Sequence, residues 1–568
     1  MKAALGRLLL ACVGAPALVV ALLALVELGY AVAGADPRRH YFLPAADEAG
    51  RALFVESRDP PISNACFRAT RFTRRPPEGT RRIVCVGDST CYGLPFDPPI
   101  PFYCWLEARL KELLPERPTE VVNLGSNGFA SEDVLDVLRD VDGAGADVLV
   151  VYVGHNEFLD RNLLPVLNPL AHAVRRALAR SRFGTDLMTA AHQPADVKVL
   201  TNSIHKERIR DEPFFTPAQI EAAHRRFRDH ILEIVELAQS RGALVVLVHP
   251  IADAADTGTG VSFFAPATPP ARRAEFRATF VELERERIAL EGVKHRAQPL
   301  DPARLAAAWA KLDALEQIDA SVVELHHQRG GLLRLEGKFE EARRECSTAL
   351  EHDGHPIRAT AAIHAILDEV ARARGALVVD PRPALDAAAA PDLPGQNGWF
   401  VDYVHPDIQG HELLADAILR ALAHANALAP EAEWRFGHEP TSQEYLDRGG
   451  WKPSSVAAMK SREALFLLVR AYYNNVSGDE VTAAARSIFK HSLEIDPNCA
   501  PAYLGLGMCA VLQKVPDEAI EQFERALAIN PSELDQLWGQ YRSQISVKAL
   551  FDAAGLAMRD GRVMKAGR

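Results

Sequence analysis

The sequence lacks the residue patterns that most metal and nucleic-acid sites need. Its eight cysteines form no Cys-x-x-Cys pair and no cluster with histidine at zinc-finger spacing, so we expect no structural metal. We also find no set of histidines and carboxylates suited to a metal-dependent hydrolase, and we expect no cofactor. There is no basic domain or lysine-rich run, and the formal net charge is −11, which argues against a nucleic-acid-binding protein.

The composition indicates a folded chain of more than one domain. Hydrophobic residues make up 48% of the 568 residues and charged residues 24%, values with which most of the chain can bury a core. This length exceeds that of one ordinary domain. Cysteine spacing does not determine disulfide connectivity, so no disulfide is assigned.

A long uncharged segment near the N-terminus predicts a membrane anchor. Residues 8–26 carry no charge, and the apolar character resumes after one glutamate as far as Ala35, which is enough to cross a bilayer as a helix. Lys2 and Arg7 precede the segment, so the positive-inside rule places the rest of the chain in the periplasm or outside the cell. Small residues near its end also fit a cleaved signal peptide and a secreted product. The apolar core is longer than is usual for such a peptide, and we favour an uncleaved anchor over residues 1–36.

Strand and helix patterns alternate between residues 81 and 425. Short β-rich runs are separated by segments with helical spacing, and this alternation predicts a parallel sheet covered by helices on both faces. The predicted strands lie within residues 81–88, 120–125, 146–157, 243–250 and 376–380. The polar stretch 37–80 in front of them, rich in arginine and proline, is interpreted as a connector.

A helical insertion is predicted over about residues 270–356. This stretch lies between the fourth predicted strand and the last helix–strand pair, and it is too long for a loop. It contains Gly330, Ala342 and Ala349 at the spacing of small residues in a helix-turn-helix repeat. The spacing resembles one tetratricopeptide-type unit.

The C-terminal region shows such a repeat more clearly. Asp496-Pro497 and Asn530-Pro531 lie 34 residues apart, the period of the tetratricopeptide repeat. The residues that match its consensus are Tyr503, Leu506, Gly507, Ala519, Phe523, Ala526 and Pro531. The sequence therefore resembles an all-α tetratricopeptide array over residues 461–545, with a linker over 426–460 and a helix or tail over 546–568. Such arrays bind peptides and proteins, so we expect a protein partner.

Four polar blocks lie where a parallel sheet places its ligand site. Ligands bind beyond the carboxyl ends of the strands in an open sheet. Three blocks follow predicted strands and the fourth precedes the last helix of the domain. They are Gly87-Asp88-Ser89, the segment 123–128, Gly154-His155-Asn156-Glu157, and the segment 402–406 with the sequence DYVHP.

In this order the four blocks resemble those of the SGNH/GDSL hydrolase superfamily. The resemblance covers roughly residues 81–425 and implies a flavodoxin-like, three-layer α/β/α fold with ester-cleaving activity. Carried over by position, it makes Ser89 the nucleophile, His405 the general base and Asp402 the carboxylate that orients the imidazole. The third block has Glu157 where aspartate is usual.

The resemblance also implies three donors for an oxyanion: the backbone N–H of Ser89, that of a glycine in the second block, and the side-chain amide of Asn156. We assign the glycine to Gly128, which lies just before a predicted helix, with Gly125 as the fallback. His155 is interpreted as lining the acyl pocket and binding substrate, or else as contacting solvent.

Each of these residues also has a structural reading. Asp88 and Ser89 fit a helix N-cap as well as a catalytic turn. His405, which precedes a proline, fits an ordinary loop histidine. The tripeptide Gly-Asp-Ser does not decide between these readings by itself.

The predicted function is a membrane-anchored, extracytoplasmic serine esterase or lipase acting on an acylated sugar, a lipid or a small ester. Hydrolysis and transfer share one acyl-enzyme, so an O-acetyltransferase or deacetylase of envelope glycans is an alternative. A second alternative, from another class, is a tetratricopeptide scaffold whose α/β domain is not catalytic.

Overall fold

The computed structural model describes most of the chain after residue 40. The described residues are 25–26, 29, 40–58, 60–61, 65–158, 209–213, 215–254, 258–295, 299–388, 399–449, 452–473, 478–534 and 545–566. The predicted N-terminal anchor lies outside them, apart from Leu25, Val26 and Gly29. Within the ranges given, no helix has both the length and the apolar character needed to span a bilayer.

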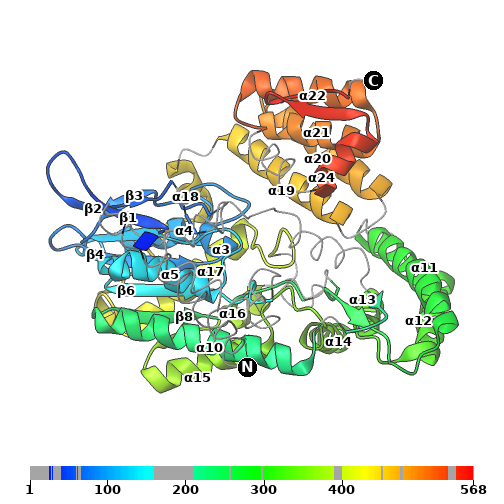
Figure 1. The fold of residues 1–568 in the computed structure, drawn as a ribbon, viewed down its shortest axis with the longest axis horizontal. Helices are drawn as coiled ribbons and strands as arrows, with labels where there is room; N and C mark the ends of the chain where they lie inside the picture. The colour runs from blue at the N-terminus through cyan, green and yellow to red at the C-terminus, as the bar shows by residue number, and fades with distance from the viewer. Residues whose placement is uncertain are drawn as a thin grey trace, which may run out of the picture.

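A parallel sheet lies at the centre of the α/β domain (Figure 1). Its five strands in the described part of the chain are β4 (Arg81–Gly87), β5 (Thr119–Asn123), β6 (Val148–Tyr152), β8 (Leu244–Val248) and β10 (Leu377–Val379). Every pair of neighbours is parallel, and the order across the sheet is β10-β8-β6-β4-β5. Numbered along the chain and read from β5, the order is 2-1-3-4-5, as in flavodoxin-like sheets.

Helices cover both faces of this sheet. Successive strand residues point to opposite faces, so Val84 and Val86 join one core while Ile83 and Cys85 join the other. The covering helices are α5 (Ser131–Asp140), α10 (Pro217–Ser240) and α15 (Ala361–Arg374) on the first face, and α4 (Phe102–Leu113) and α17 (Ile408–His424) on the second. The predicted parallel sheet between helical layers is confirmed.

The predicted connector over 37–80 carries a small antiparallel sheet instead. Its strands are β1 (Phe42–Ala46), β2 (Ala52–Glu56) and β3 (Arg71–Thr73). Aromatic rings fix it to the domain, because Phe67 packs against Phe42 and against Phe129, which precedes α5. The aromatic residues in this stretch are spaced irregularly, so no strand pattern marked them in the sequence.

The first part of the predicted linker over 426–460, residues 426–449, is also part of the folded domain, and its last residues begin α19 (Pro453–Tyr473). Trp434 and Tyr445 are buried in the same core as α4, and the rings of Tyr445 and Trp105 lie 3.8 Å apart. Tyr445 belongs to a short helix, α18 (Ser442–Arg448), and its hydroxyl donates to the Pro99 carbonyl at 2.6 Å. The domain therefore extends to about residue 449.

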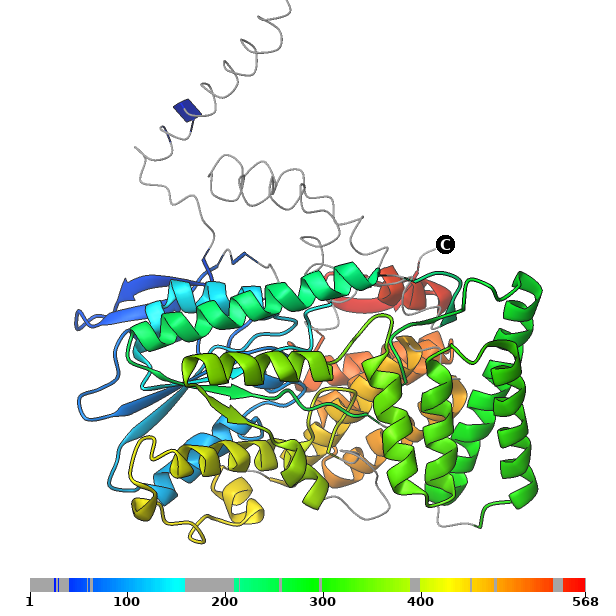
Figure 2. The ribbon, with the colours of Figure 1, turned by 90° about the horizontal axis from the view of Figure 1, so that it is seen from below.

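The insertion is helical, as predicted. Its helices are α11 (Pro270–His295), α12 (Pro302–Asp319), α13 (Glu324–Leu335) and α14 (Phe339–Glu351). Figure 2 shows them, in green, as a group beside the sheet. A Cβ atom at Gly330 would lie 2.5 Å from Cys346 Sγ, so the glycine lets α13 and α14 approach closely.

A helical array follows α18. Its elements are α19 (Pro453–Tyr473), α20 (Gly478–Ile495), α21 (Ala500–Leu512), α22 (Pro516–Ile529), α24 (Ile545–Ala553) and the hairpin β11 (Leu556–Arg559) and β12 (Arg562–Lys565). A Cβ at Gly507 would lie 2.6 Å from the Phe523 ring, so this consensus position lets α21 and α22 pack closely. The predicted helix or tail over 546–568 ends in the β-hairpin, whose Val563 is buried in the core of the array.

Candidate active site

Ser89 begins a one-turn helix directly after β4. Asp88 caps this helix, α3 (Ser89–Tyr92), because its Oδ1 accepts the backbone N–H of Thr90 at 3.0 Å. Gly87 has φ of 158°, and a Cβ there would lie 1.9 Å from the Tyr152 carbonyl oxygen. Only glycine fits at this bend, which turns the chain from the strand toward Ser89. The N-cap reading of Gly-Asp-Ser is therefore correct and is compatible with a catalytic serine.

The structure brings Ser89, His405 and Asp402 together. His405 Nε2 lies 2.7 Å from Ser89 Oγ, and His405 Nδ1 lies 2.7 Å from Asp402 Oδ2. With Nδ1–H donated to the carboxylate, Nε2 presents a lone pair and the Ser89 hydroxyl donates to it. All three residues are buried, with exposed fractions of 6%, 5% and 4% for Ser89, His405 and Asp402. The backbone of His405 lies in a loop, as the alternative interpretation predicts. Its side chain, however, is bonded to the Asp402 carboxylate and to the Ser89 hydroxyl.

The loop that carries His405 is fixed from two sides. Asp402 Oδ1 accepts the backbone N–H groups of Val404 and His405, both at 2.8 Å. The Thr90 hydroxyl, one residue beyond Ser89, donates to the Val404 carbonyl at 3.1 Å. The serine helix and the histidine loop are therefore joined by a direct hydrogen bond in addition to the one within the triad.

The second and third blocks lie next to each other. The Asn156 amide donates to the carbonyl of Phe129, the residue after Gly128, at 2.9 Å. Gly128 has φ of 70°, a conformation that favours glycine. The N–H of Gly125 donates to Asn123 Oδ1 at 2.7 Å, so the fallback donor is already used. The oxyanion role of Gly128 and Asn156 stays a prediction.

His155 is buried rather than exposed to solvent, which rules out one of its two interpretations. Its Nδ1 accepts the backbone N–H of Ala359 at 3.1 Å, just before α15. Burial lowers the pKa of His155 to about 3. The ring is a neutral structural acceptor in this arrangement, and its predicted contact with substrate stays a prediction.

Glu157 is bonded to the start of the helix that follows the second block. Its carboxylate accepts both the N–H and the hydroxyl of Ser131, at 2.8 and 2.9 Å, so it fixes the start of α5 beside the second block. Burial raises the pKa of Glu157 to about 7, against the opposing effect of these two donors.

We expect Glu157→Gln to remove a pH dependence of stability. The pKa is raised from 4.5 to about 7 in the folded chain, so the folded state holds an extra proton between these values. The contribution of this proton to the free energy of unfolding is complete below pH 4.5 and is lost as the pH rises to about 7, a change of about 3 kcal/mol. Relative to the glutamine variant, the free energy of unfolding of the wild type should fall by this amount across that window, measured by urea unfolding.

The comparison must be a difference between the two proteins, because His230 titrates in the opposite sense. Burial lowers the pKa of His230 to about 4, so this histidine destabilises the fold as the pH falls through the same range. Glu112→Gln, on α4, is the control, since Glu112 forms an exposed ion pair with Arg448 and does not act on the pKa of His230. Equal pH profiles for the wild type and Glu157→Gln would contradict the prediction.

In the part of the chain that the structure describes, neither a cluster of metal ligands nor a disulfide lies near the triad. Among the described residues there is no group of three or more histidine, cysteine, aspartate or glutamate side chains that could hold a metal ion. Cys85 and Cys91, close to Ser89 in sequence, are buried free thiols whose pKa burial raises well above the usual range. The arrangement offers a hydroxyl nucleophile, a base and an orienting carboxylate.

Comparisons with known proteins add one family and a set of remote structural neighbours. Solved structures similar to this chain include an acetylxylan esterase, Axe2, from Geobacillus stearothermophilus, with 13% identity and a TM-score of 0.27, covering 60% of this chain and 94% of that chain. They also include TesA, with 12% identity, a TM-score of 0.25 and coverage of 60% and 98%. A GDSL-like lipase from Bacteroides thetaiotaomicron has 11% identity, a TM-score of 0.25 and coverage of 62% and 92%.

At these identities and TM-scores, the chemistry of the α/β domain has to be argued from the geometry of the triad. The search of curated proteins found no match. The tetratricopeptide repeat family matches residues 478–541, inside the predicted range 461–545. This region of the chain is a tetratricopeptide repeat array.

Proposed function

We propose that the α/β domain is a serine hydrolase that cleaves an ester through an acyl-enzyme. The observation that carries the proposal is the buried hydrogen-bonded series from Asp402 through His405 to Ser89 Oγ, with both contacts at 2.7 Å. Nucleophile, base and orienting group within hydrogen-bonding distance are the geometric signature of nucleophilic catalysis.

In the proposed reaction, Ser89 Oγ attacks the acyl carbon while His405 Nε2 takes the hydroxyl proton. The carbonyl oxygen becomes an oxyanion, and Asp402 stabilises the imidazolium that forms. Collapse of the tetrahedral intermediate breaks the bond to the alkoxy oxygen, which leaves as an alcohol with the proton from His405. Water then attacks the acyl-enzyme by the same steps and releases the carboxylic acid.

Asn156→Ala is expected to lower kcat by about 10²–10³-fold with little change in KM, because a donor placed for the oxyanion acts mainly in the transition state. Steady-state kinetics with p-nitrophenyl acetate measure this effect. Asn530→Ala serves as the control, since this asparagine lies just after α22 in the repeat array and its amide donates to Glu533 Oε2 at 2.8 Å instead. A loss confined to KM would assign Asn156 to ground-state binding.

The proposal is tested directly by labelling the full chain with a fluorophosphonate and locating the adduct by peptide mass spectrometry. We expect one adduct, on Ser89, and slower labelling when a short-chain ester competes. The heat-unfolded chain is the control and should stay unlabelled, since its serine has no base beside it. Absence of an adduct on Ser89, or equal labelling after unfolding, would refute the hydrolase and leave the tetratricopeptide scaffold as the function.

The finer parts of the proposal come from the sequence. We propose that residues 8–35 anchor the chain with its catalytic domain outside the cytoplasm, and that the acceptor is water, with transfer to or removal from a glycan hydroxyl as the alternative. Mass spectrometry of the N-terminal peptide from isolated membranes separates an anchor from a signal peptide. A mature chain that begins near residue 37 would overturn the anchor.

A screen of acetylated sugars, lipids and short esters, with and without a glycan acceptor, identifies the substrate.

A further inference from the structure

The catalytic loop is held at its middle by a residue that follows β8. The backbone N–H of Asp253 donates to the carbonyl of Tyr403 at 2.9 Å. Tyr403 is the residue after Asp402 and is two residues before His405. Thr90 holds the same loop from the serine side through the Val404 carbonyl. The position of the loop therefore depends on where the Asp253 backbone lies.

Arg358 fixes that backbone. Its guanidinium donates from Nη1 to the Asp253 carbonyl at 2.5 Å and from Nη2 to the Gly258 carbonyl at 2.8 Å. Arg358 is only 3% exposed. A buried charge is costly unless its donors are satisfied, so these bonds constrain both carbonyls strongly. The planar guanidinium can reach two acceptors at once, which a lysine ammonium does less well.

The segment beyond Gly258 is attached to the helical insertion. The N–H and hydroxyl of Thr259 both donate to Glu324 Oε2, at 2.8 and 2.7 Å. Glu324 is the first residue of α13 and is fully buried. On the other side, Asp353 accepts the N–H groups of Gly260 and Val261, at 2.6 and 3.0 Å. Residues 258–261 are thus clamped between the insertion and the segment that leads to Arg358.

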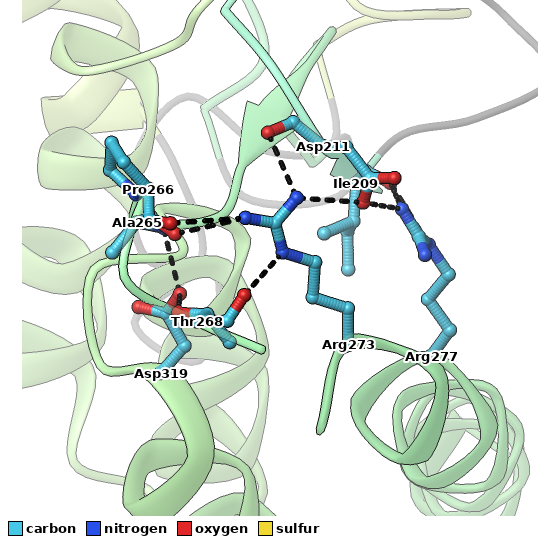
Figure 3. A network of polar contacts seen from close by, with 8 residues as sticks. All are labelled: Ile209, Asp211, Ala265, Pro266, Thr268, Arg273, Arg277 and Asp319. Atoms are coloured by element: carbon cyan, nitrogen blue, oxygen red, sulfur yellow. Dashed lines mark hydrogen bonds and ion pairs between the residues drawn. The ribbon is translucent and has the colours of Figure 1, made fainter. Parts of the chain in front are cut away.

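The insertion also holds residues 265–268, and it holds a second stretch, residues 209–211. Figure 3 shows Arg273 and Arg277 of α11 beside Ile209, in the short strand β7 (Ile209–Arg210), and Asp211. Arg277 donates to the Ile209 carbonyl and to Asp211 Oδ1, and Arg273 donates to the Asp211 carbonyl. Arg273 also donates to the carbonyl of Thr268, and Asp319 at the end of α12 accepts the N–H of Ala265. Residues 258–268 are therefore bound to the insertion along their length, and their start is bound to the catalytic loop through Arg358.

We propose that Arg358 is a positioning residue that couples the helical insertion to the catalytic loop and holds His405 against Ser89. The inference rests on the proposed hydrolase function, because it concerns the efficiency of the same triad. It gives the insertion a task within this chain: it provides the rigid support from which the Asp253 backbone holds the Tyr403 carbonyl. Arg358 itself touches no member of the triad in the contacts described above.

The test uses the full chain with Arg358→Met, which keeps the length of the side chain and removes both donors. We expect kcat for p-nitrophenyl acetate to fall by about 10²-fold, the cost of a small displacement of a catalytic group, while KM stays nearly constant. Arg358→Lys should recover part of kcat, because an ammonium can still donate to one or both carbonyls. If the methionine variant fails to fold, the lysine variant alone should lie between inactive and wild type in kcat, again at constant KM.

Arg82→Met is the matched control. Arg82 is a fully buried arginine at the start of β4, the other end of the strand from Ser89, and it also donates to two backbone carbonyls, those of Thr73 and Ala144. Its replacement should lower the unfolding temperature but leave kcat of the folded enzyme unchanged. Equal kcat for Arg358→Met and Arg82→Met, or a loss that appears only in KM, would overturn the inference.

A second readout separates this inference from the hydrolase proposal. The hydrogen between His405 Nδ1 and Asp402 should give a downfield proton NMR resonance in the wild type that needs no substrate. We expect Arg358→Met to lose or shift it and Arg82→Met to keep it. If the wild type hydrolyses no ester but the resonance still depends on Arg358, the proposed function fails and the positioning role stands. An unchanged resonance in Arg358→Met overturns the positioning role.

Discussion

Ser89→Ala is expected to lower kcat for ester hydrolysis by about 10⁶-fold, the loss measured when the nucleophile of a serine triad is removed. The variant keeps its fold, because the Asp88 cap and the Thr90 bond to Val404 do not involve the Ser89 hydroxyl. Only the oxyanion donors and substrate binding would remain to give residual catalysis. Steady-state kinetics with p-nitrophenyl acetate measure the loss.

Two further variants make this result specific. Ser461→Ala removes another buried serine hydroxyl, in α19 of the repeat array, and should leave kcat unchanged. The double variant Ser89→Ala/His405→Ala should be no slower than Ser89→Ala alone, because residues that act as one unit are not additive. A double variant that loses a further large factor would show that His405 acts independently of Ser89.

Asp402→Asn is expected to lower kcat by about 10⁴-fold. The two Asp402 oxygens do different work: Oδ1 accepts the loop N–H groups, while Oδ2 accepts from His405 Nδ1. Asparagine can keep an oxygen at the first position, so the loop is retained. The amide nitrogen at the second position favours the wrong tautomer of His405, with the hydrogen on Nε2 facing Ser89. The pH–rate profile and kcat together report this change.

Asp407→Asn is the matched control for this substitution. Asp407 lies two residues beyond His405 and caps α17, where its Oδ1 accepts the Gly410 N–H at 2.7 Å. Asparagine caps helices as well as aspartate does, so kcat should stay at the wild-type value. A similar loss of kcat in both variants would indicate that disturbance of the loop, rather than loss of the Asp402 charge, accounts for the effect.

The sheet could be predicted from local sequence patterns, whereas the roles of Ser89, His405 and Asp402 were predicted from the resemblance of four separate blocks to one superfamily. Apolar runs such as Ile83–Val86 indicate buried parallel strands, and the common direction of the strands in a parallel sheet places their carboxyl ends at one edge. Ser89 and His405 lie 316 residues apart in the chain and yet form a hydrogen bond. Their meeting was predicted from the four blocks taken together, since no block alone was specific.

The two segments in which the structure differs from the prediction, the connector and the linker, are held by contacts between residues that are distant in the sequence. The strands β1 to β3 follow no period-two pattern, and residues 426–449 are polar in sequence yet bury Trp434 and Tyr445 against α4. The sequence does not identify Arg358 as a positioning residue, because its bonds go to the backbone carbonyls of Asp253 and Gly258. Every residue type has such a carbonyl, so neither partner forms a recognisable motif. A motif search finds groups that react, whereas the groups that hold them are identified only in three dimensions.

The docking of residues 426–449 decides where the α/β domain can be separated from the repeats. A chain that stops after α17 would leave Trp105 without the ring of Tyr445 and would break the ion pair between Arg117 and Glu433. The exposed apolar surface would favour self-association. The shortest piece expected to fold as an autonomous, soluble unit therefore runs from about residue 40 to residue 449, and the repeat array begins only after it.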